Sequence, residues 1–286
     1  MKPIITMPSN PKLEGLVTLL PDIPFAHRNG ADLMLKMLLP WGPEADPAAK
    51  YPLVVFIQGS AWTIPDQHWQ IPQLAELARR GYVVASVTHR SCNDVPAPAF
   101  LVDVKASIRF LRAHAEEYHI DPERVCAWGT SSGGNTALLL GMTGGDPRYE
   151  TDENADQSSE VKLVVDCFGP TDLVRMATIQ FENPDEDIVT LIHNLAGGSL
   201  EDGMDLVRSI SPTDLVQDGM TLPPMLLLHG DADDLVLYSD TLAFYEKLQN
   251  YGYDSTLVKV EGAPHEGSFW SQDLLKVIFD FIDERI

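Results

Sequence analysis

The feature that most constrains the fold is an alternation of short apolar runs with longer runs of helical spacing. Short, mainly apolar runs are typical of strands that are covered on both faces. Such runs occupy residues 33–39, 53–57, 82–89, 125–128, 161–168, 225–229 and 255–260. Apolar positions at helical spacing occupy residues 71–81, 100–120, 132–142, 240–252 and 271–284. The alternation predicts an α/β fold in which helices cover both faces of a mostly parallel sheet.

Length and composition favour a single domain. The chain has 286 residues, of which 44% are hydrophobic, and this is enough for one large core. It contains no internal repeat, and no linker rich in proline, glycine or serine separates two apolar patterns. We therefore expect one domain over residues 1–286. Ligands bind beyond the carboxyl ends of the strands in such sheets, so the residues that follow strands are the informative ones.

The charge of the chain argues against several classes of partner. Its 42 acidic and 20 basic residues give a net charge of −22, which repels nucleic acid and anionic membrane surfaces. The N-terminal residues lack the apolar core of a secretory signal, and no run reaches the ~18 apolar residues of a membrane span. Three cysteines, two of them in apolar runs, are typical of free thiols, so we expect a cytoplasmic protein. The sequence is compatible with a monomer or a homo-oligomer.

No metal or cofactor site is expected. His114 and His119 lie on one predicted helix at a spacing that points them to different faces. The acidic stretches 145–160 and 181–188 lack the spacing and the glycine of a calcium-binding loop, so we expect solvated loops or cap elements there. Zinc-ligand spacing and phosphate-binding loops are absent from the sequence.

Gly129, Ser131 and Gly133 form a G-x-S-x-G motif between a predicted strand and a predicted helix. This is the context of a nucleophile elbow, in which the two glycines let strand and helix approach each other closely. The serine then lies at a helix N-terminus, whose free N–H groups favour negative charge. Ser132 lacks these flanks, because a threonine stands two residues before it. The motif predicts that Ser131 is a nucleophile, and a glycine-rich turn without chemistry is the alternative.

A serine hydroxyl needs a general base, and the base needs an orienting carboxylate. Three histidines follow Ser131, namely His193, His229 and His265. His265 lies in a loop after the predicted strand 255–260, from which it can reach a serine on a central strand, so it is the predicted base. His229 closes a strand and is predicted to be structural. His193 lies in an irregular region with no strand before it.

The acid is expected in the loop after the preceding strand. Residues 229–236 read "HGDADDLV" and offer Asp231, Asp233 and Asp234. In the chain order of α/β-hydrolases the acid lies between the serine and the histidine, and this loop does. Spacing alone does not choose among the three carboxylates, and a solvated acidic loop is the alternative for any one of them.

An acyl-transfer site also needs backbone N–H groups that point at the developing negative charge. We expect one from Ser132, the residue after the nucleophile, and another from the loop 58–62, which follows the strand 53–57. Trp62 is the last residue of this loop, and Trp69 follows it in the chain. They are candidates for an aromatic wall against an acyl or sugar group, with ordinary packing as the alternative.

Together these residues resemble an α/β-hydrolase carboxylesterase, similar to microbial acetylxylan- and feruloyl-esterase-like enzymes and to esterases of the hormone-sensitive-lipase type. The resemblance runs from about residue 30 onward. The matching stretches are "QGSAW" (58–62), "GTSSGG" (129–134), "VVDCFGPTDL" (164–173), "SPTDL" (211–215), "HGDADDLV" (229–236) and "EGAPHEG" (261–267). The resemblance implies a sheet of about eight strands and a small cap around residues 172–210. It also implies Asp233 as the acid, His265 as the base, and Ser60 or Ala61 as the second oxyanion donor.

The chain departs from the family pattern in the oxyanion loop. Gln58 stands where the family usually has a histidine, and Ser60 and Ala61 replace two glycines. The stretch "VTHRS" (87–91) stands where such enzymes usually have a Tyr-Arg pair. Side chains at positions 60 and 61 change which N–H can point into the oxyanion hole. We expect Gln58 to support the loop by hydrogen bonding.

The sequence therefore predicts a serine carboxylesterase that acts on a small-molecule ester through an acyl-enzyme. The expected substrates carry short acyl groups, with acetyl or feruloyl esters of carbohydrates as candidates. One alternative is a serine peptidase of the prolyl-oligopeptidase type, which shares the fold and motif order but carries a propeller for which this chain has no room. The other is a catalytically silent binding protein on the same fold, and the complete order of serine, acid and histidine speaks against it.

Overall fold

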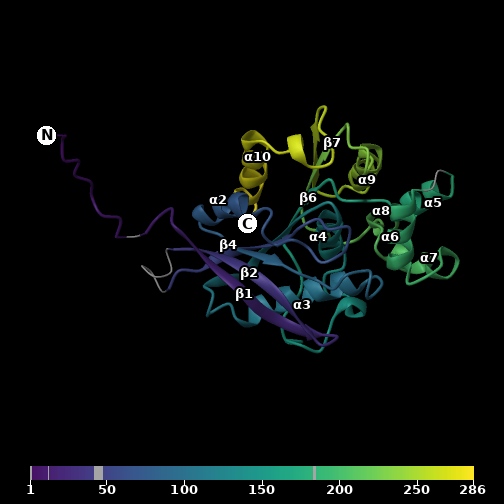
Figure 1. Ribbon diagram of the computed structural model, residues 1–286, viewed down its shortest axis with the longest axis horizontal. Helices are drawn as coiled ribbons and strands as arrows, with labels where there is room; N and C mark the ends of the chain where they lie inside the picture. Colours follow the sequence, from purple (N-terminus) through teal and green to yellow (C-terminus); the bar gives the residue numbers. More distant parts are fainter. Residues whose placement is uncertain (1, 12, 42–47, 183–184) are drawn as a thin grey trace.

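A computed structural model of the chain describes residues 2–11, 13–41, 48–182 and 185–286. At its centre lies one eight-stranded sheet with the order β1-β2-β4-β3-β5-β6-β7-β8 (Figure 1). The strands are β1 (Val17–Arg28), β2 (Ala31–Pro40), β3 (Tyr51–Ile57), β4 (Val83–Val87), β5 (Ile120–Thr130), β6 (Leu163–Cys167), β7 (Met225–Gly230) and β8 (Ser255–Val260). β2 pairs antiparallel with β1 and β4, and all the pairs from β4 to β8 are parallel. The predicted α/β fold with a mostly parallel sheet is confirmed.

β1 is the strand that the apolar pattern did not predict. It contains Pro21 and Pro24, and a proline cannot donate to a ladder. The register with β2 shifts between Leu20 and Ile23 and again between Pro24 and Ala26. Such irregularities are tolerated because β1 lies at the edge of the sheet, where one side of the strand needs no partner.

β3 shows why the predicted strands are mainly apolar. Leu53, Val55 and Ile57 pack into the core on one face of the sheet, and Val54 and Phe56 pack into the core on the other. Each of the five is at most 1% exposed. Alternate side chains of a strand point to opposite faces, so a strand covered on both faces has mainly apolar positions.

Helices supply the cover on both faces (Figure 1). α2 (Ile71–Arg79) and α10 (Gln272–Asp283) pack on one face, and α3 (Ala99–Ala113), α4 (Ser132–Met142) and α9 (Tyr238–Asn250) pack on the other. The predicted helix 100–120 is too long, because α3 ends at Ala113 and Ile120 already belongs to β5. His119 between them has a φ of 55°, and its carbonyl accepts a hydrogen bond from the Tyr51 N–H. This link to β3 replaces the last helical turns.

The connection from β6 to β7 is helical rather than irregular, which corrects the sequence prediction. It contains α5 (Leu173–Glu182), α6 (Glu186–Ala196), α7 (Leu200–Ser209) and α8 (Pro212–Leu215). Asp185 and Ser199 cap α6 and α7 by accepting backbone N–H groups with their side chains. Residues 183 and 184, inside the acidic stretch 181–188, lie outside the described residues. α5, α6 and α7 lie together at one end of the molecule (Figure 1), and their action as a cap stays a prediction.

Three further expectations concern membrane spans, the cysteines and the acidic stretch 145–160. None of the helices in the described ranges is long and apolar enough to cross a membrane. Cys92, Cys126 and Cys167 are buried, free thiols. The acidic stretch 145–160 is only partly a solvated loop, because Glu150 forms ion pairs with the buried side chains of Lys105 and Arg109.

Candidate active site

Ser131 lies in the turn between β5 and α4. Its φ of 52° and ψ of −125° place it outside the conformations that L-residues ordinarily adopt. A Cβ atom on Gly129 would lie 2.0 Å from the Gly133 carbonyl oxygen, and one on Gly133 would lie 2.0 Å from the Ile57 carbonyl oxygen. Both flanking positions therefore require glycine, and the serine hydroxyl is left at the N-terminus of α4.

His265 lies in the loop after β8, which β6 and β7 separate from β5, and its side chain reaches the elbow. Its Nε2 is 3.0 Å from the Ser131 Oγ. The Phe168 ring packs against the imidazole in a T-shaped arrangement, with 4.7 Å between the ring centroids. The side chain of His265 is 14% exposed. The imidazole is thus held from one side and is close enough to take the proton of the serine hydroxyl.

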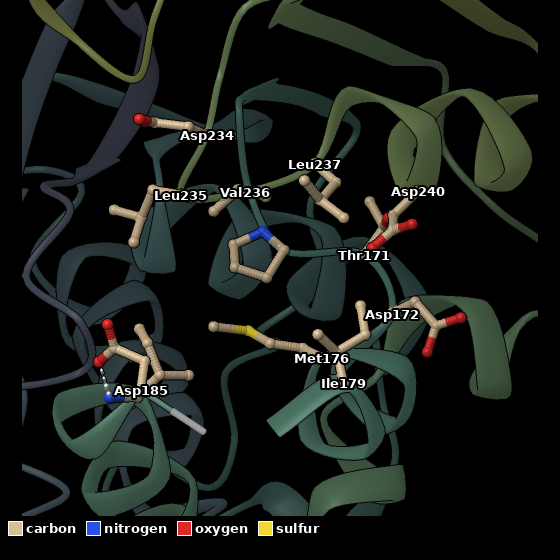
Figure 2. A pocket seen from close by; sticks show the side chains of 12 residues that line it. Thr171, Asp172, Met176, Ile179, Asp185, Asp234, Leu235, Val236, Leu237 and Asp240 are labelled. Carbon is tan, nitrogen blue, oxygen red and sulfur yellow. Dashed lines mark hydrogen bonds between the residues drawn. The ribbon is translucent and has the colours of Figure 1, made fainter. Parts of the chain in front are cut away.

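Of the three candidate carboxylates, the structure brings Asp233 to His265. The Asp233 Oδ2 is 2.7 Å from the Nδ1 of His265. Asp231 instead accepts a hydrogen bond from the Gly262 N–H, which lowers the pKa of its carboxyl, and it pairs with a lysine on β8. Asp234 lies in the same loop with its carboxylate turned outward (Figure 2). The position that the resemblance implied is therefore the one that contacts the histidine.

The Asp233 carboxylate is fully buried and richly hydrogen-bonded. Its Oδ1 accepts from the backbone N–H groups of Leu235 and Val236, at 3.0 and 2.9 Å. Its Oδ2 accepts from His265 and lies 3.2 Å from the Nε2 of His229. Burial alone would raise the pKa of the Asp233 carboxyl, but hydrogen bonds from the two histidines and the backbone outweigh it and hold the pKa well below its usual range. Asp233 is therefore ionised throughout the physiological range.

The loop 58–62 lies beside the elbow and carries the expected oxyanion donors. The Ser60 N–H already donates to the Ser132 Oγ at 2.9 Å. The backbone N–H groups of Ala61 and Ser132 have no acceptor within the described residues. Ala61 has a φ of 51°, so its peptide group is turned in a way that an extended loop would not allow. Of the two positions expected from the resemblance, Ala61 has the free N–H.

Gln58 is held against β5 rather than against the loop itself. Its Nε2 is 3.4 Å from the Thr130 Oγ1, which also accepts the Gly59 N–H at 2.9 Å. The residue is 6% exposed, and its Oε1 is buried without a partner in the described chain. Gln58 and Gly59 thus share one hydroxyl, which ties the start of the loop to the residue before Ser131.

A cavity of about 340 Å³ opens onto these groups. It is lined by Gln58, Gly59, Ser60, Ala61, Asp66, Trp69, Ser131, Leu235, His265 and Glu266. Trp69 is 66% exposed at this cavity. Trp62, which we expected to stand beside it, is 1% exposed and packs in the core against Phe100, with 6.1 Å between the ring centroids. The expectation for Trp62 is corrected: the chain turns here with a positive φ of 54°, and the indole lies in the hydrophobic core rather than at the cavity.

A second cavity, of about 210 Å³, lies on the other side of Leu235, which lines both (Figure 2). Its wall comes from α5, α6 and the loop that carries Asp233. Figure 2 shows the side chains of Met176 and Leu235 directed into it, whereas the Asp172 carboxylate points away. The interior is therefore mainly apolar. Leu235 is 50% exposed and stands between this space and the serine.

Three residues at the site were not found from the sequence. Phe168 supports the imidazole, Leu235 divides the two cavities, and Glu266 lines the cavity beside His265. Burial raises the pKa of the Glu266 carboxyl, which accepts a hydrogen bond from the Trp270 indole at 2.7 Å. Glu266 directly follows the histidine, so its place in the sequence was a usable signal; the other two depend on the tertiary fold.

The remaining sequence candidates lie away from Ser131 or in supporting positions. His193 is exposed on α6. His229 is fully buried at the end of β7. Within the described ranges, no group of three or more histidine, cysteine, aspartate or glutamate side chains could hold a metal ion.

Comparisons with known proteins place this site in a family context. The BD-FAE family matches residues 42–248. Esterase LipQ of Mycobacterium tuberculosis is 27% identical over 83% of this chain and 58% of its own length. A truncated carbohydrate esterase from gut microbiota is 29% identical, with a TM-score of 0.79 over 94% of this chain and 96% of its own. The esterase Est2 of the planctomycete Thermogutta terrifontis is 26% identical, with a TM-score of 0.75 over 92% and 91%.

Further structures of Est2 extend the comparison. They include complexes of Est2 with propionate and butyrate and forms modified by tabun and paraoxon. The present chain spans about half the length of the curated relatives that it matches. The predicted resemblance to microbial carboxylesterases is confirmed, and so is the class of hydrolase to which the chain is related.

Proposed function

This chain belongs to the BD-FAE family, and from that premise we propose that it is a serine carboxylesterase acting on small-molecule esters of short acyl groups. The observation that carries the proposal is the hydrogen-bonded series Ser131–His265–Asp233, with distances of 3.0 and 2.7 Å. Beside it lie the backbone N–H groups of Ala61 and Ser132, which have no acceptor among the described residues. Each part has a defined role in acyl transfer.

In the first half of the reaction, the Ser131 Oγ attacks the ester carbonyl carbon while His265 takes the hydroxyl proton on Nε2. The Nδ1–H of His265 donates to Asp233, so the imidazole presents the correct nitrogen to the serine and its positive charge is stabilised. Collapse of the tetrahedral intermediate transfers that proton to the leaving alcohol and leaves an acyl-enzyme. Water then attacks the acyl group with His265 as the base, which releases the acid and restores Ser131.

The tetrahedral oxyanion is proposed to bind the N–H groups of Ala61 and Ser132. Ser132 is the first residue of α4, so its N–H lies at the positive end of a helix. The Ser60 N–H supports the arrangement indirectly by holding the Ser132 hydroxyl. Preorganised donors of this kind contribute because they need no rearrangement as the charge develops.

The proposed acyl group is short, from acetyl to butyryl. The cavity of about 340 Å³ supports this, as do the propionate and butyrate bound to the related Est2. We further propose a carbohydrate as the alcohol, which the similarity to a gut carbohydrate esterase supports. A feruloyl group is a second candidate, favoured only by the exposed Trp69 at the cavity.

We propose the domain organisation, the compartment and the partners of the enzyme from less specific features. The single domain spans residues 1–286, with α5, α6 and α7 as a small cap and no cofactor. The free cysteines favour a reducing compartment, and we propose the cytoplasm. The net charge of −22 disfavours nucleic acid and anionic membranes as partners, and a homo-oligomer is compatible with the acidic surface.

A panel of p-nitrophenyl esters, from acetyl to decanoyl, tests the proposal. We expect kcat/KM to be highest between acetyl and butyryl and to fall beyond about eight carbons, since the cavity at Ser131 has a volume of only about 340 Å³. A matched ester and anilide with the same acyl group separates esterase from peptidase. Equal kcat/KM values for the two would contradict the proposal, because an amine leaves less readily than an alcohol and needs a more elaborate site.

A further inference from the structure

We propose that His229 is a positioning residue for this hydrolysis, which fixes the Asp233 carboxylate so that one oxygen faces His265. The inference rests on the proposed function, because it concerns the same site. The sequence alone suggested only a structural histidine at the end of a strand. The contacts of its imidazole are more specific than that.

The His229 side chain is fully buried and is hydrogen-bonded through both ring nitrogens. Its Nε2 is 2.9 Å from the Val236 carbonyl oxygen and 3.2 Å from the Asp233 Oδ2. Its Nδ1 is 2.8 Å from the Thr241 Oγ1 on α9. A carbonyl oxygen only accepts, so Nε2 carries a hydrogen and donates to it and to the carboxylate. The Thr241 hydroxyl then donates to Nδ1, and this arrangement fixes the tautomer.

The two oxygens of Asp233 are held in different ways. Oδ1 is anchored by the backbone N–H groups of Leu235 and Val236, which belong to the same loop. Oδ2 contacts only His265 and His229 among the hydrogen-bonding partners in the described chain. During the reaction His265 gains and loses a proton on Nε2, so the strength of its Nδ1–H contact with Oδ2 changes although the contact itself persists. The contact with His229 is present in both protonation states of the base.

The surroundings of His229 make it a rigid anchor. It belongs to β7, which pairs with β6 and β8 on either side. Its polar contacts come from two elements: the loop after β7, through the Val236 carbonyl and the Asp233 carboxylate, and α9, through Thr241. The titratable groups around it are Asp233, Asp166 on β6, and Tyr238, whose ring centroid is 6.0 Å from that of His229. The imidazole of His229 thus joins the loop that carries Asp233 to the sheet and to α9.

A matched pair of amide substitutions separates positioning from mere support. In His229→Gln the amide nitrogen falls near the place of Nε2 and still donates to Asp233. In His229→Asn the shorter amide keeps the contact with Thr241 but does not reach the carboxylate. Both are polar and similar in size, so they impose comparable costs on the fold. Thr241→Val is the control that removes the hydroxyl without touching Asp233.

The first readout is the rate at which an organophosphonate ester labels Ser131, measured from pH 5 to 9 (about the range in which histidines titrate). We expect His229→Asn to label on the order of 10- to 100-fold more slowly, as for other residues that orient a reacting group. The acid limb of the profile should move to lower pH, because a displaced Asp233 carboxylate stabilises the protonated imidazole of His265 less. His229→Gln should recover most of the rate, and Thr241→Val should lose less than about 5-fold. KM for a short ester should stay unchanged in all three.

The second readout is the downfield proton NMR signal of the hydrogen bond between His265 and Asp233, which requires no turnover. We expect it in the wild type and in His229→Gln, and we expect it to shift upfield or vanish in His229→Asn. Equal rates and signals in the Asn and Gln variants would overturn the proposal, as would an acid limb that stays fixed or moves to higher pH. If wild-type Ser131 is not labelled, the proposed function fails, whereas the NMR comparison still decides the role of His229.

Discussion

On one side of Ser131 lie His265 and Asp233, and on the other lies the loop 58–62. On the first side the side chains of Ser131, His265 and Asp233 are hydrogen-bonded to one another. The Asp233 carboxylate accepts four hydrogen bonds in all. On the second side the Ala61 N–H is free and the Gln58 Oε1 is buried without a partner among the described residues. The polar groups of the acid–base side already have partners, whereas the loop still has groups that can form hydrogen bonds with a ligand.

The two sides also depend on different properties of the chain. The acid–base side needs particular side chains, held by strands β7 and β8. The loop needs particular backbone angles, with positive φ at Ala61 and Trp62, and its backbone N–H groups are tied to the elbow by the hydroxyls of Thr130 and Ser132. We therefore expect substitutions on the acid–base side to abolish the chemistry, and substitutions at the loop to reduce it by degrees.

Ser131→Ala should have the largest effect, because it removes the nucleophile on which both sides act. We expect kcat for a short ester to fall by about 10⁴-fold or more. The measurement is steady-state hydrolysis at saturating ester, with the thermal midpoint as a check on folding. Retention of more than a hundredth of the wild-type kcat would remove Ser131 from the mechanism.

Asp233→Asn should cut kcat by about 10³- to 10⁴-fold, because the amide would favour the wrong imidazole tautomer. Asp231→Asn and Asp234→Asn are matched controls in the same loop, and we expect each to lose less than about 3-fold. Equal losses in all three variants would show that the loop acts as a whole through its charge.

Asp166 extends the comparison to a carboxyl on β6 that lacks partners of the kind Asp233 has. Its Oδ1 accepts from the Gly169 N–H at 2.9 Å, while Oδ2 has no partner in the described chain. Burial raises its pKa to about 7. The folded state then holds a proton that the unfolded state releases near pH 4, so this group lowers stability as pH rises from about 4 to about 7.

The linkage sets an upper bound of about 4 kcal/mol on that loss, at 1.36 kcal/mol per pKa unit. Asp166→Asn should flatten the decline, which thermal unfolding at pH 5 and pH 8 measures. A variant with the same pH dependence as the wild type would show that Asp166 is ionised in the folded protein.

Gln58→Ala tests the loop side. Gln58 aligns the loop through Thr130 rather than contacting the oxyanion, so we expect kcat to fall on the order of 10-fold with little change in KM. Initial-rate kinetics over a range of ester concentrations separates the two constants. An unchanged kcat would mean that Gln58 only packs against β5.

Ser132→Ala should have the smallest effect. The backbone N–H that is proposed to bind the oxyanion remains, and the change removes only the acceptor of the Ser60 N–H. We expect a loss of about 2- to 5-fold in kcat. A loss as large as that of Ser131→Ala would exchange the roles of the two serines.

The distinction between residue type on one side and backbone angles on the other also explains which parts of the site could be predicted from the sequence. Ser131 and His265 were found because their flanks and chain order are properties of residue types. The choice among Asp231, Asp233 and Asp234 depended on the resemblance, since neighbours in one loop differ only in where their side chains point. The occupied Ser60 N–H, the inward turn of Trp62 and the contacts of His229 depend on backbone angles and tertiary packing. β1 was missed because its prolines are tolerated only at a sheet edge.

The central claim is that Ser131 is the nucleophile activated by His265 and Asp233, and covalent labelling tests it most directly. The protein is incubated with an organophosphonate ester, digested, and mapped by mass spectrometry, with Ser131→Ala and Asp233→Asn in parallel. The account predicts one adduct, on Ser131, that is absent from Ser131→Ala and forms at least about 100-fold more slowly in Asp233→Asn. An adduct on Ser132, or equal labelling of Asp233→Asn and wild type, would contradict it.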